Sequence, residues 1–327
     1  MHPILCRIPL PFGWGAIPIH TYGLMLMLAF LMGTALTVRR AQRAGIRAEL
    51  VLDLALYALV AGIIGARAAF LIFDDGWNDP ASEHPLLDMV SIWKGGLTFQ
   101  GGLVLGLAVC LWYMRSHRLP VGKIADLFAP GLALGVALGR VGCFLNGCCW
   151  GRICPPDFPL GVSFPRYAEP GTYGSVIRSH WDQFHERMLL PLLDSLGYRD
   201  LAARLRDLHP LSDIPPAGLE FIRVHPTQLY STAALLGICL LLLALERLPR
   251  RFEGAVMLAF LMAYSVFRFS IEFLRDDTPL LLGFGSFPGL HLGQILSILV
   301  FGAALGTFIH LWRSAGRATV TGAGETP

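Results

Sequence analysis

The sequence predicts an all-α, polytopic integral membrane protein, and three observations carry that prediction. The chain has 327 residues, of which 54% are hydrophobic and only 15% are charged. Its mean hydropathy of +0.56 is well above what a soluble domain of this size needs. The apolar residues gather in long segments, and clusters of basic residues lie in alternate connections between these segments.

Seven apolar segments are long enough to cross a hydrocarbon core about 30 Å thick as α-helices. We therefore expect a bundle of about seven transmembrane helices. In chain order, the segments are 17–38, 50–73, 97–114, 124–145, 227–245, 255–273 and 290–312.

The basic residues predict how the bundle is oriented. The short connections on one side hold only Lys94 and Arg275, whereas the connections on the other side are rich in arginine. The positive-inside rule then places the N-terminus outside and the C-terminus in the cytoplasm. The cytoplasmic clusters are Arg39, Arg40, Arg43 and Arg47; Arg115, Arg118 and Lys123; Arg247, Arg250 and Arg251; Arg313 and Arg317.

This topology divides the chain into four parts. Residues 1–146 hold helices one to four, 147–226 form an extracytoplasmic loop, 227–312 hold helices five to seven, and 313–327 form a cytoplasmic tail. Within the loop, large apolar residues recur at helical spacing among charges between about 179 and 208. An amphipathic helix on the membrane or bundle fits this pattern, and so does a solvent-exposed helical cap. The apolar residues are Trp181, Phe184, Met188, Leu192 and Leu196.

Three arginines, Arg67, Arg140 and Arg268, lie inside the predicted spans. Each is on a helix that runs outward, and each is near the outer end of that helix. A charge in the hydrocarbon costs several kcal/mol and usually marks function. Arginine binds phosphate oxygens bidentately, so three guanidinium groups at one depth favour an anionic lipid headgroup as ligand. The structural alternative is a buried ion pair between Arg67 and Glu272.

Other polar side chains are predicted at the same depth. They open or close the spans at their outer ends, where they can serve as helix-end polar groups or line a ligand site. These residues are His20, Tyr22, Gln100, Asn146, His225, Gln228, Tyr230 and Glu272.

Six ordered motifs resemble those of the prolipoprotein diacylglyceryl transferases of bacteria. The longest is GRVGCFLNGCCWG at 139–151, which is similar to the family pattern G-R-x-G-N-F-x-N-x-E-x-x-G. The other five are IHTYGL at 19–24, GGLTFQGGL at 95–103, HPTQLY at 225–230, FRFSIEFLR at 267–275 and GQILS at 293–297.

The resemblance implies a seven-span enzyme of the bacterial inner membrane that uses no cofactor. It would transfer a diacylglyceryl group from phosphatidylglycerol to the lipobox cysteine of a preprolipoprotein, forming a thioether and releasing glycerol-1-phosphate. By position, Arg140 and Arg268 would hold the phosphate and stabilise the leaving group. Family positions tied to binding or activity fall on Tyr22, Asn146, Gly151, Glu272 and Arg275.

The chain departs from the family pattern where acid–base chemistry is expected. The histidine of the second motif is Gln100, which cannot act as a base. The first asparagine and the glutamate of the central motif are Cys143 and Cys148, and Ser231 stands where a further glutamate is usual. His20 and His225 remain as titratable candidates for activating the acceptor thiol, beside substrate-assisted deprotonation in the field of the arginines.

Four cysteines, Cys143, Cys148, Cys149 and Cys154, follow the spacing C-x4-C-C-x4-C. This is not a familiar zinc-site spacing, so the sequence assigns no metal ligand among the candidate site residues. A disulfide of Cys148 or Cys149 with Cys154, buried free thiols, and a catalytic or metal role all remain open.

Two rival functions remain beside the transferase. A divergent paralogue would bind an anionic phospholipid or perform a different lipid transfer. A transporter would use the arginines as an anion path, but the charges gather at one depth instead of crossing the membrane. We expect no nucleic-acid partner.

Overall fold

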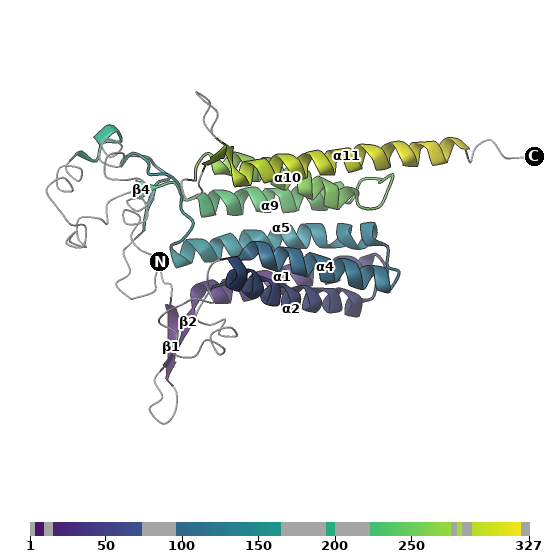
Figure 1. The fold of residues 1–327 in the computed structure, drawn as a ribbon, viewed down its shortest axis with the longest axis horizontal. Helices are drawn as coiled ribbons and strands as arrows, with labels where there is room; N and C mark the ends of the chain where they lie inside the picture. Colours follow the sequence, from purple (N-terminus) through teal and green to yellow (C-terminus); the bar gives the residue numbers. More distant parts are fainter. Residues whose placement is uncertain are drawn as a thin grey trace, which may run out of the picture.

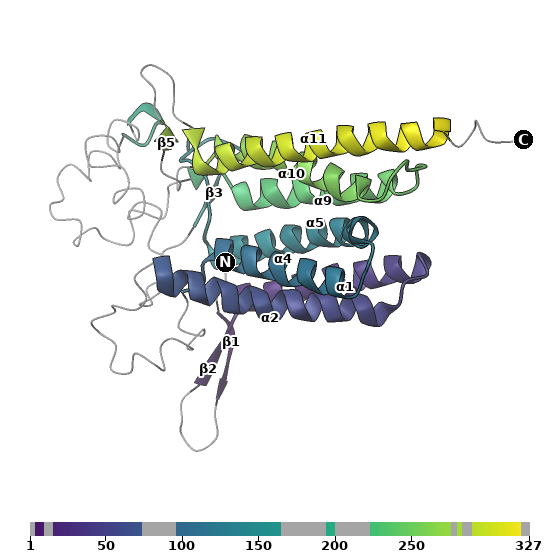
Figure 2. The ribbon, with the colours of Figure 1, turned by 45° about the vertical axis from the view of Figure 1, so that its right-hand side comes forward.

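The computed structural model describes residues 4–9, 16–73, 96–164, 194–199, 223–275, 280–282 and 290–321. Within them, long helices run side by side, and short strand pairs gather at one end of the bundle, which we call the strand end (Figures 1 and 2). The helices are α1 Thr21–Arg43, α2 Ala48–Phe73, α4 Phe99–Ser116, α5 Val121–Asn146, α9 Thr227–Leu245, α10 Ala255–Glu272 and α11 Leu292–Thr321.

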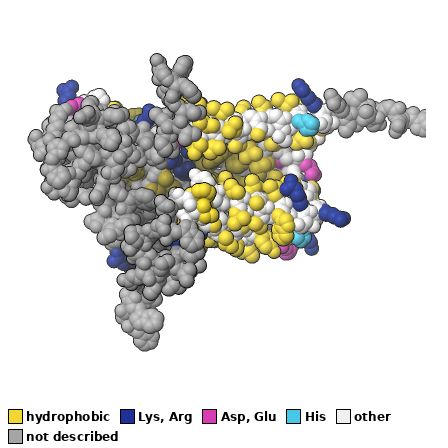
Figure 3. Space-filling model, in the orientation of Figure 1, with side chains coloured by type: hydrophobic (Ala, Val, Ile, Leu, Met, Phe, Trp, Pro, Cys, Tyr) yellow, Lys and Arg dark blue, Asp and Glu magenta, His cyan; other side chains and the backbone are white. Residues whose placement is uncertain are grey.

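The bundle is that of a multi-pass membrane protein. Every helix except α4 is long and apolar enough to cross a membrane, which gives six candidate spans among the described residues. The predicted third span is also helical, as the 18-residue α4. Hydrophobic side chains cover the helical part, and arginine or lysine side chains mark the end opposite the strands (Figure 3). Such a large exposed apolar surface suits lipid contact.

Two predicted spans begin in residues that form strands. Residues 17–20 belong to β2 (Ala16–His20), which pairs antiparallel with β1 (Ile4–Pro9). Pro18 favours extended backbone before it and offers no N–H, so the helix begins only at Thr21. Residues 290–291 form β6 (Leu290–His291) and pair with β5 (Leu280–Leu282).

The start of α11 has a visible cause. The backbone N–H of His291 donates to Oε1 of Gln294 at 3.1 Å. A glutamine that reaches back to the residue before a helix closes its N-terminus, as in a capping box. The last helix therefore begins at Leu292 and not at residue 290.

Glycines allow the closest helix pairs, α1 with α5 and α2 with α4. A Cβ on Gly33 of α1 would lie 2.8 Å from the carbonyl oxygen of Gly131 on α5. A Cβ on Gly65 of α2 would lie 2.6 Å from the Cβ of Leu105 on α4. Small residues bring helix backbones together in membranes, where water supplies no hydrophobic force between helices.

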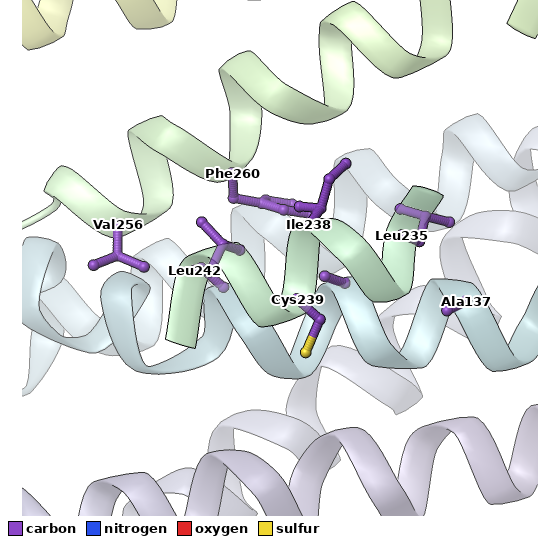
Figure 4. Packing of buried hydrophobic residues seen from close by; sticks show 9 residues of the cluster. Ala137, Leu235, Ile238, Cys239, Leu242, Val256 and Phe260 are labelled. Carbon is purple, nitrogen blue, oxygen red and sulfur yellow. The ribbon is translucent and has the colours of Figure 1, made fainter. Parts of the chain in front are cut away.

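A hydrophobic core packs α9 against α5 and α10. Leu235 and Leu242 of α9 are fully buried between α5 and α10, where they meet Ala137, Val256 and Phe260 (Figure 4). This core fixes α9 and α10 against α5, and these three helices carry the site described below.

A buried polar network holds the end opposite the strands. Arg40 is only 4% exposed, although the sequence placed it in a cytoplasmic cluster beyond the first span. Its Nε donates to Glu246 at 2.8 Å and its Nη2 donates to the carbonyl of Asp126 at 3.1 Å. The Asp126 carboxylate accepts the N–H groups of Gly254 and Met257, both at 2.9 Å, and so caps α10. The helix α1 extends past the predicted span, to Arg43, and so carries Arg40 into this buried network.

We predict that Gly131→Ala lowers the free energy of unfolding by about 1–3 kcal/mol, because overpacking forces the two backbones apart. The new Cβ would lie 2.6 Å from the carbonyl oxygen of Gly33. Gly237→Ala is the matched control, because a Cβ there meets nothing within 4 Å. Thermal unfolding in detergent compares the two variants, and equal midpoints would contradict close packing at Gly131.

Candidate active site

The site begins where α5 ends at the strand end. Gly147 adopts a left-handed conformation with φ of +76°, which glycine accepts without strain. The N–H of Cys148 then donates back to the carbonyl of Cys143 at 3.1 Å. The turn therefore folds the following residues over the last turn of α5.

The next residues are seated between two helix ends. The N–H of Gly151 donates to His225 just before α9, and the N–H of Arg152 donates to Leu274 just after α10, at 2.9 and 2.8 Å. A Cβ on Gly151 would lie 2.6 Å from Cγ2 of Thr227. Gly151 is thus the point at which the backbone passes too close for a side chain.

Three thiols gather on this turn. The sulfur atoms of Cys143, Cys148 and Cys149 all lie within 4.8 Å of one another, and we call this group the thiol cluster. Two side chains of α9 hold its backbone: Gln228 donates to the carbonyl of Cys148 at 2.7 Å, and Thr227 donates to that of Cys149 at 2.8 Å.

The thiols have different acidities. Hydrogen bonds from Cys143 and Cys148, with the positive charges of Arg275 and Arg140, hold the pKa of the Cys149 thiol well below its usual range. The hydrogen bonds with Cys143 and Cys149 raise the pKa of Cys148. The positive charges of Arg275 and Arg140 therefore favour a thiolate at Cys149.

All seven cysteines lie in described residues and have free thiols. The disulfide of Cys148 or Cys149 with Cys154 is therefore absent. Cys154 is buried beside Gly161, where an added Cβ would lie 2.8 Å from the Cys154 sulfur, and its carbonyl accepts the Tyr198 hydroxyl at 2.9 Å. Because these contacts belong to the next part of the chain, Cys154 is not a member of the thiol cluster.

Arg140 lies on α5 one turn before the thiol cluster and is partly buried. Its charge acts on the hydroxyl of Tyr22 and on the sulfur atoms of Cys143 and Cys149. The ring of Tyr22 lies against Gly142, where a Cβ would be 3.3 Å from its Cδ2. Among the described residues, no carboxylate pairs with Arg140.

Arg268 has a different environment. It forms an ion pair with Glu272 one turn later on α10, and the Glu272 side chain is fully buried. Gly293 of α11 covers this pair, since its Cβ would lie 2.9 Å from Nη2 of Arg268. Glu272 therefore has an ion partner on its own helix, Arg268. The structural alternative from the sequence had instead paired Glu272 with Arg67.

Arg67 and Gln100 lie on the α2–α4 pair. Arg67 donates to the carbonyl of Gly96 at 2.9 Å, and its guanidinium lies 5.1 Å from the ring centroid of Phe70. Gln100 is exposed in the first turn of α4. Arg67 and Gln100 lie at the strand end, as Arg140 does, but they are on α2 and α4, whereas Arg140 is on α5.

The two candidate bases have unequal surroundings. His20 is exposed at the end of β2. His225 is partly buried, with its ring edge-on to Phe158 at 4.8 Å and Nδ1 3.4 Å from the Tyr230 hydroxyl. Burial lowers the pKa of His225, so the neutral imidazole is favoured. Asn146 is the last residue of α5 and is partly buried.

Comparison with known proteins gives the family. The sequence profile of the prolipoprotein diacylglyceryl transferases matches residues 9–310. The chain belongs to this family. Similar relatives named phosphatidylglycerol–prolipoprotein diacylglyceryl transferase come from several bacteria. That of Xanthomonas campestris pv. campestris is 31% identical over 91% of this chain and 88% of the relative. The relatives from Photorhabdus laumondii subsp. laumondii and Burkholderia thailandensis are 32% and 30% identical, covering 94% and 95% of this chain and 94% and 96% of the relatives.

The sequence analysis did not identify Arg223, which holds together the chain that follows the thiol cluster in this transferase-family protein. Arg223 donates to the carbonyls of Gly161 and Pro156 at 2.7 and 2.8 Å, and its N–H donates to the Tyr198 hydroxyl at 2.9 Å. These contacts hold β3 (Val162–Ser163) on β4 (Arg223–Val224). The partners are 25 to 67 residues apart in sequence, so no local pattern announces them.

The amphipathic helix predicted between about 179 and 208 lies mostly outside the described residues. Of this segment the structure describes only residues 194–199.

We predict that Gly151→Ala unseats the turn that carries the thiol cluster. The variant should label faster with a maleimide at Cys148 and Cys149 and unfold at a lower temperature, because the new Cβ collides with Thr227. Gly139→Ala, in the same motif, is the control, since its Cβ would meet only Leu26 at 3.8 Å. Identical labelling rates for the two variants would show that the backbone at Gly151 does not pack closely against Thr227.

Protonation of His225 should destabilise the fold. Its pKa is lowered from 6.5, so the unfolded chain takes up the proton first as the pH falls. The stability contributed by neutral His225 is fully present above pH 6.5 and is lost as the pH falls through the lower, folded value. His225→Gln should therefore lose less stability than the unaltered protein between neutral and acidic pH.

Thermal unfolding across that pH range measures the difference. His310→Gln, at an exposed position on α11, is the control and should keep the pH dependence of the unaltered protein. A His225→Gln profile parallel to the unaltered one would show that His225 contributes nothing to it.

Proposed function

We propose that this protein transfers the diacylglyceryl group of phosphatidylglycerol to the cysteine thiol of a preprolipoprotein signal peptide. The acceptor thiol loses its proton, its sulfur bonds to the glyceryl carbon, and the bond from that carbon to the phosphate oxygen breaks. Glycerol-1-phosphate leaves with the electron pair. The names of the relatives supply both substrates, and one observation in the structure supports their use here. That observation is Arg140, partly buried on the membrane-spanning helix α5 with no carboxylate partner among the described residues, where the Tyr22 ring lies against Gly142 of the same helix.

Arg140 is the anchor for the phosphate in this proposal. A guanidinium presents paired N–H donors that match phosphate oxygens. Fixed donors in a water-poor site stabilise the charge that develops on the leaving phosphate, and they do so without reorganising. Tyr22 lies in the field of Arg140 and offers a further hydroxyl donor to the same group.

Arg268 plays a more restricted part than Arg140. The ion pair with buried Glu272 offsets its charge and fixes its direction. It therefore contributes positioned N–H donors more than net positive charge. The remaining substrate-binding residues in the proposal are Asn146, Gly151, Gln100, Glu272, Arg275 and Arg67.

The two histidines are the proposed proton acceptors among the side chains of the site. The neutral form of His225 can accept a proton, and its lowered pKa keeps it in that form at neutral pH. His20 lies at the entrance of α1, where the acceptor peptide arrives from outside. Deprotonation by the departing phosphate is the substrate-assisted alternative.

The proposed location is the bacterial inner membrane, with the strand end outside. The arginine and lysine side chains at the opposite end support this orientation, because positive charges remain on the cytoplasmic side (Figure 3). In this arrangement residues 147–226 lie over the outer opening of the site, and residues 313–327 enter the cytoplasm.

The test gives the purified protein phosphatidylglycerol vesicles and a lipobox peptide and follows the peptide mass. The unaltered protein should add one diacylglyceryl group, and Arg140→Ala should lose about 100- to 1,000-fold in rate, as removal of a transition-state donor does. Arg118→Ala, at the opposite end, is the matched control and should keep full rate. The Xanthomonas campestris relative serves as the positive control.

Absence of an adduct with intact protein and an active positive control would refute the transferase. Retained binding of phosphatidylglycerol in that case would favour the divergent paralogue. The paralogue is the second candidate because Gln100, Cys143 and Cys148 stand where the family pattern has a histidine, an asparagine and a glutamate.

A further inference from the structure

The thiol cluster has the geometry of a small metal site. The three sulfur atoms are within 4.8 Å of one another. Three thiolates bound to one tetrahedral zinc at about 2.3 Å would be about 3.8 Å apart. The sulfurs therefore need to close by about 1 Å at most, a movement that rotation of the side chains supplies.

The backbone that carries the cluster is already fixed. The N–H of Cys148 is bound to Cys143, and the carbonyls of Cys148 and Cys149 are bound to Gln228 and Thr227. The left-handed turn at Gly147 brings together cysteines whose spacing in sequence is unlike that of known zinc motifs. The chain thus holds three convergent thiols without any bond between their sulfurs.

We propose that Cys143, Cys148 and Cys149 bind one thiophilic divalent cation of the zinc class and leave a fourth coordination position open for the acceptor thiol. The use of that fourth position rests on the proposed transferase function. Among the described residues, no further histidine, cysteine or carboxylate joins the three sulfurs. Three protein ligands and one open position are the arrangement of catalytic zinc sites, whereas structural sites have four.

The surrounding charges suit the loaded site. A divalent cation with three thiolates carries one net negative charge, and a bound acceptor thiolate adds a second. Two guanidinium groups, those of Arg140 and Arg275, act on the sulfur of Cys149. Their two positive charges offset the two negative ones, which lowers the cost of holding thiolates in a partly buried place.

An orphaned polar atom lies beside the cluster. Oε1 of Gln228 is buried and has no hydrogen-bond partner among the described residues, although Nε2 of the same amide is bound to Cys148. Such an acceptor needs a donor. A water on the metal or an N–H of the arriving peptide supplies one.

The metal would replace a general base. A thiol that coordinates a divalent cation loses its proton to water at neutral pH. The metal-bound sulfur then attacks the glyceryl carbon as the bond to the phosphate oxygen breaks, and the oxidation state of the metal does not change. Gln100 in place of a histidine is compatible with this route, because no side chain has to take the proton.

The experiment first measures binding of the metal alone. Full-length protein, reduced and freed of metal by a chelator, is titrated with Zn²⁺ in detergent, and Co²⁺ is used to detect thiolate charge-transfer absorption. One equivalent should bind, and Cys148→Ser should weaken binding at least about tenfold. Cys148→His keeps a ligand atom and should restore binding. Cys110→Ser, outside the cluster, is the matched control.

Circular dichroism and thermal unfolding establish that each variant is folded. Zinc affinity unchanged in folded Cys148→Ser, absence of the cobalt band, or a disulfide within the cluster in the protein isolated from cells would each overturn the proposal.

Activity is a separate readout. Chelation should abolish lipid transfer to the peptide, and Zn²⁺ should restore it. Transfer at full rate by verified metal-free protein would refute the open-position role. Tight zinc binding in a protein that never transfers lipid would support the metal site and refute only the proposed transferase function.

Discussion

The site depends on one constraint, which is that backbone groups near the membrane interior must find partners within the protein. After α5 the chain leaves the helix, and its N–H groups bond to His225 before α9 and to Leu274 after α10. Leu274 follows the C-terminus of α10, where helix carbonyl groups lack partners within the helix, and His225 precedes the N-terminus of α9. The turn therefore forms only when α5, α9 and α10 are packed together. The core of α9 supplies that packing, so the position of the thiols follows from the assembly of the bundle.

Buried charges are distributed by the same logic. At the end opposite the strands Arg40 pairs with Glu246 and Arg250 pairs with Asp126, and at the strand end Arg268 pairs with Glu272. These groups hold helices together and keep little net charge for a ligand. Arg140 is different, because no carboxylate pairs with it among the described residues. The contrast separates arginines that are paired with carboxylates from Arg140, whose charge no described carboxylate offsets.

The sequence predicted the helices well because long apolar runs report directly on contact with lipid. It placed two helix starts in residues that form strands, since β2 and β6 are stabilised by pairing with other segments and not by their own composition. The ion pair between Arg268 and Glu272 could have been predicted from the sequence, because residues four apart on a helix are neighbours. The thiol cluster was not, since it depends on the left-handed turn at Gly147 and on Thr227 and Gln228, about 80 residues away.

Arg140 and Cys143 are three residues apart on one helix and so lie on the same face. An alkyl transfer to sulfur needs a thiolate and a stabilised leaving phosphate in the same small volume. In the proposed reaction, the last turn of α5 provides for both, with the Arg140 guanidinium for the phosphate and the thiol cluster for the acceptor. A histidine base reached from another helix would have to be aligned by tertiary packing. The thiols follow Arg140 in the same stretch of chain, so the turn at Gly147 and its tertiary seat at Gly151 place all three of them together.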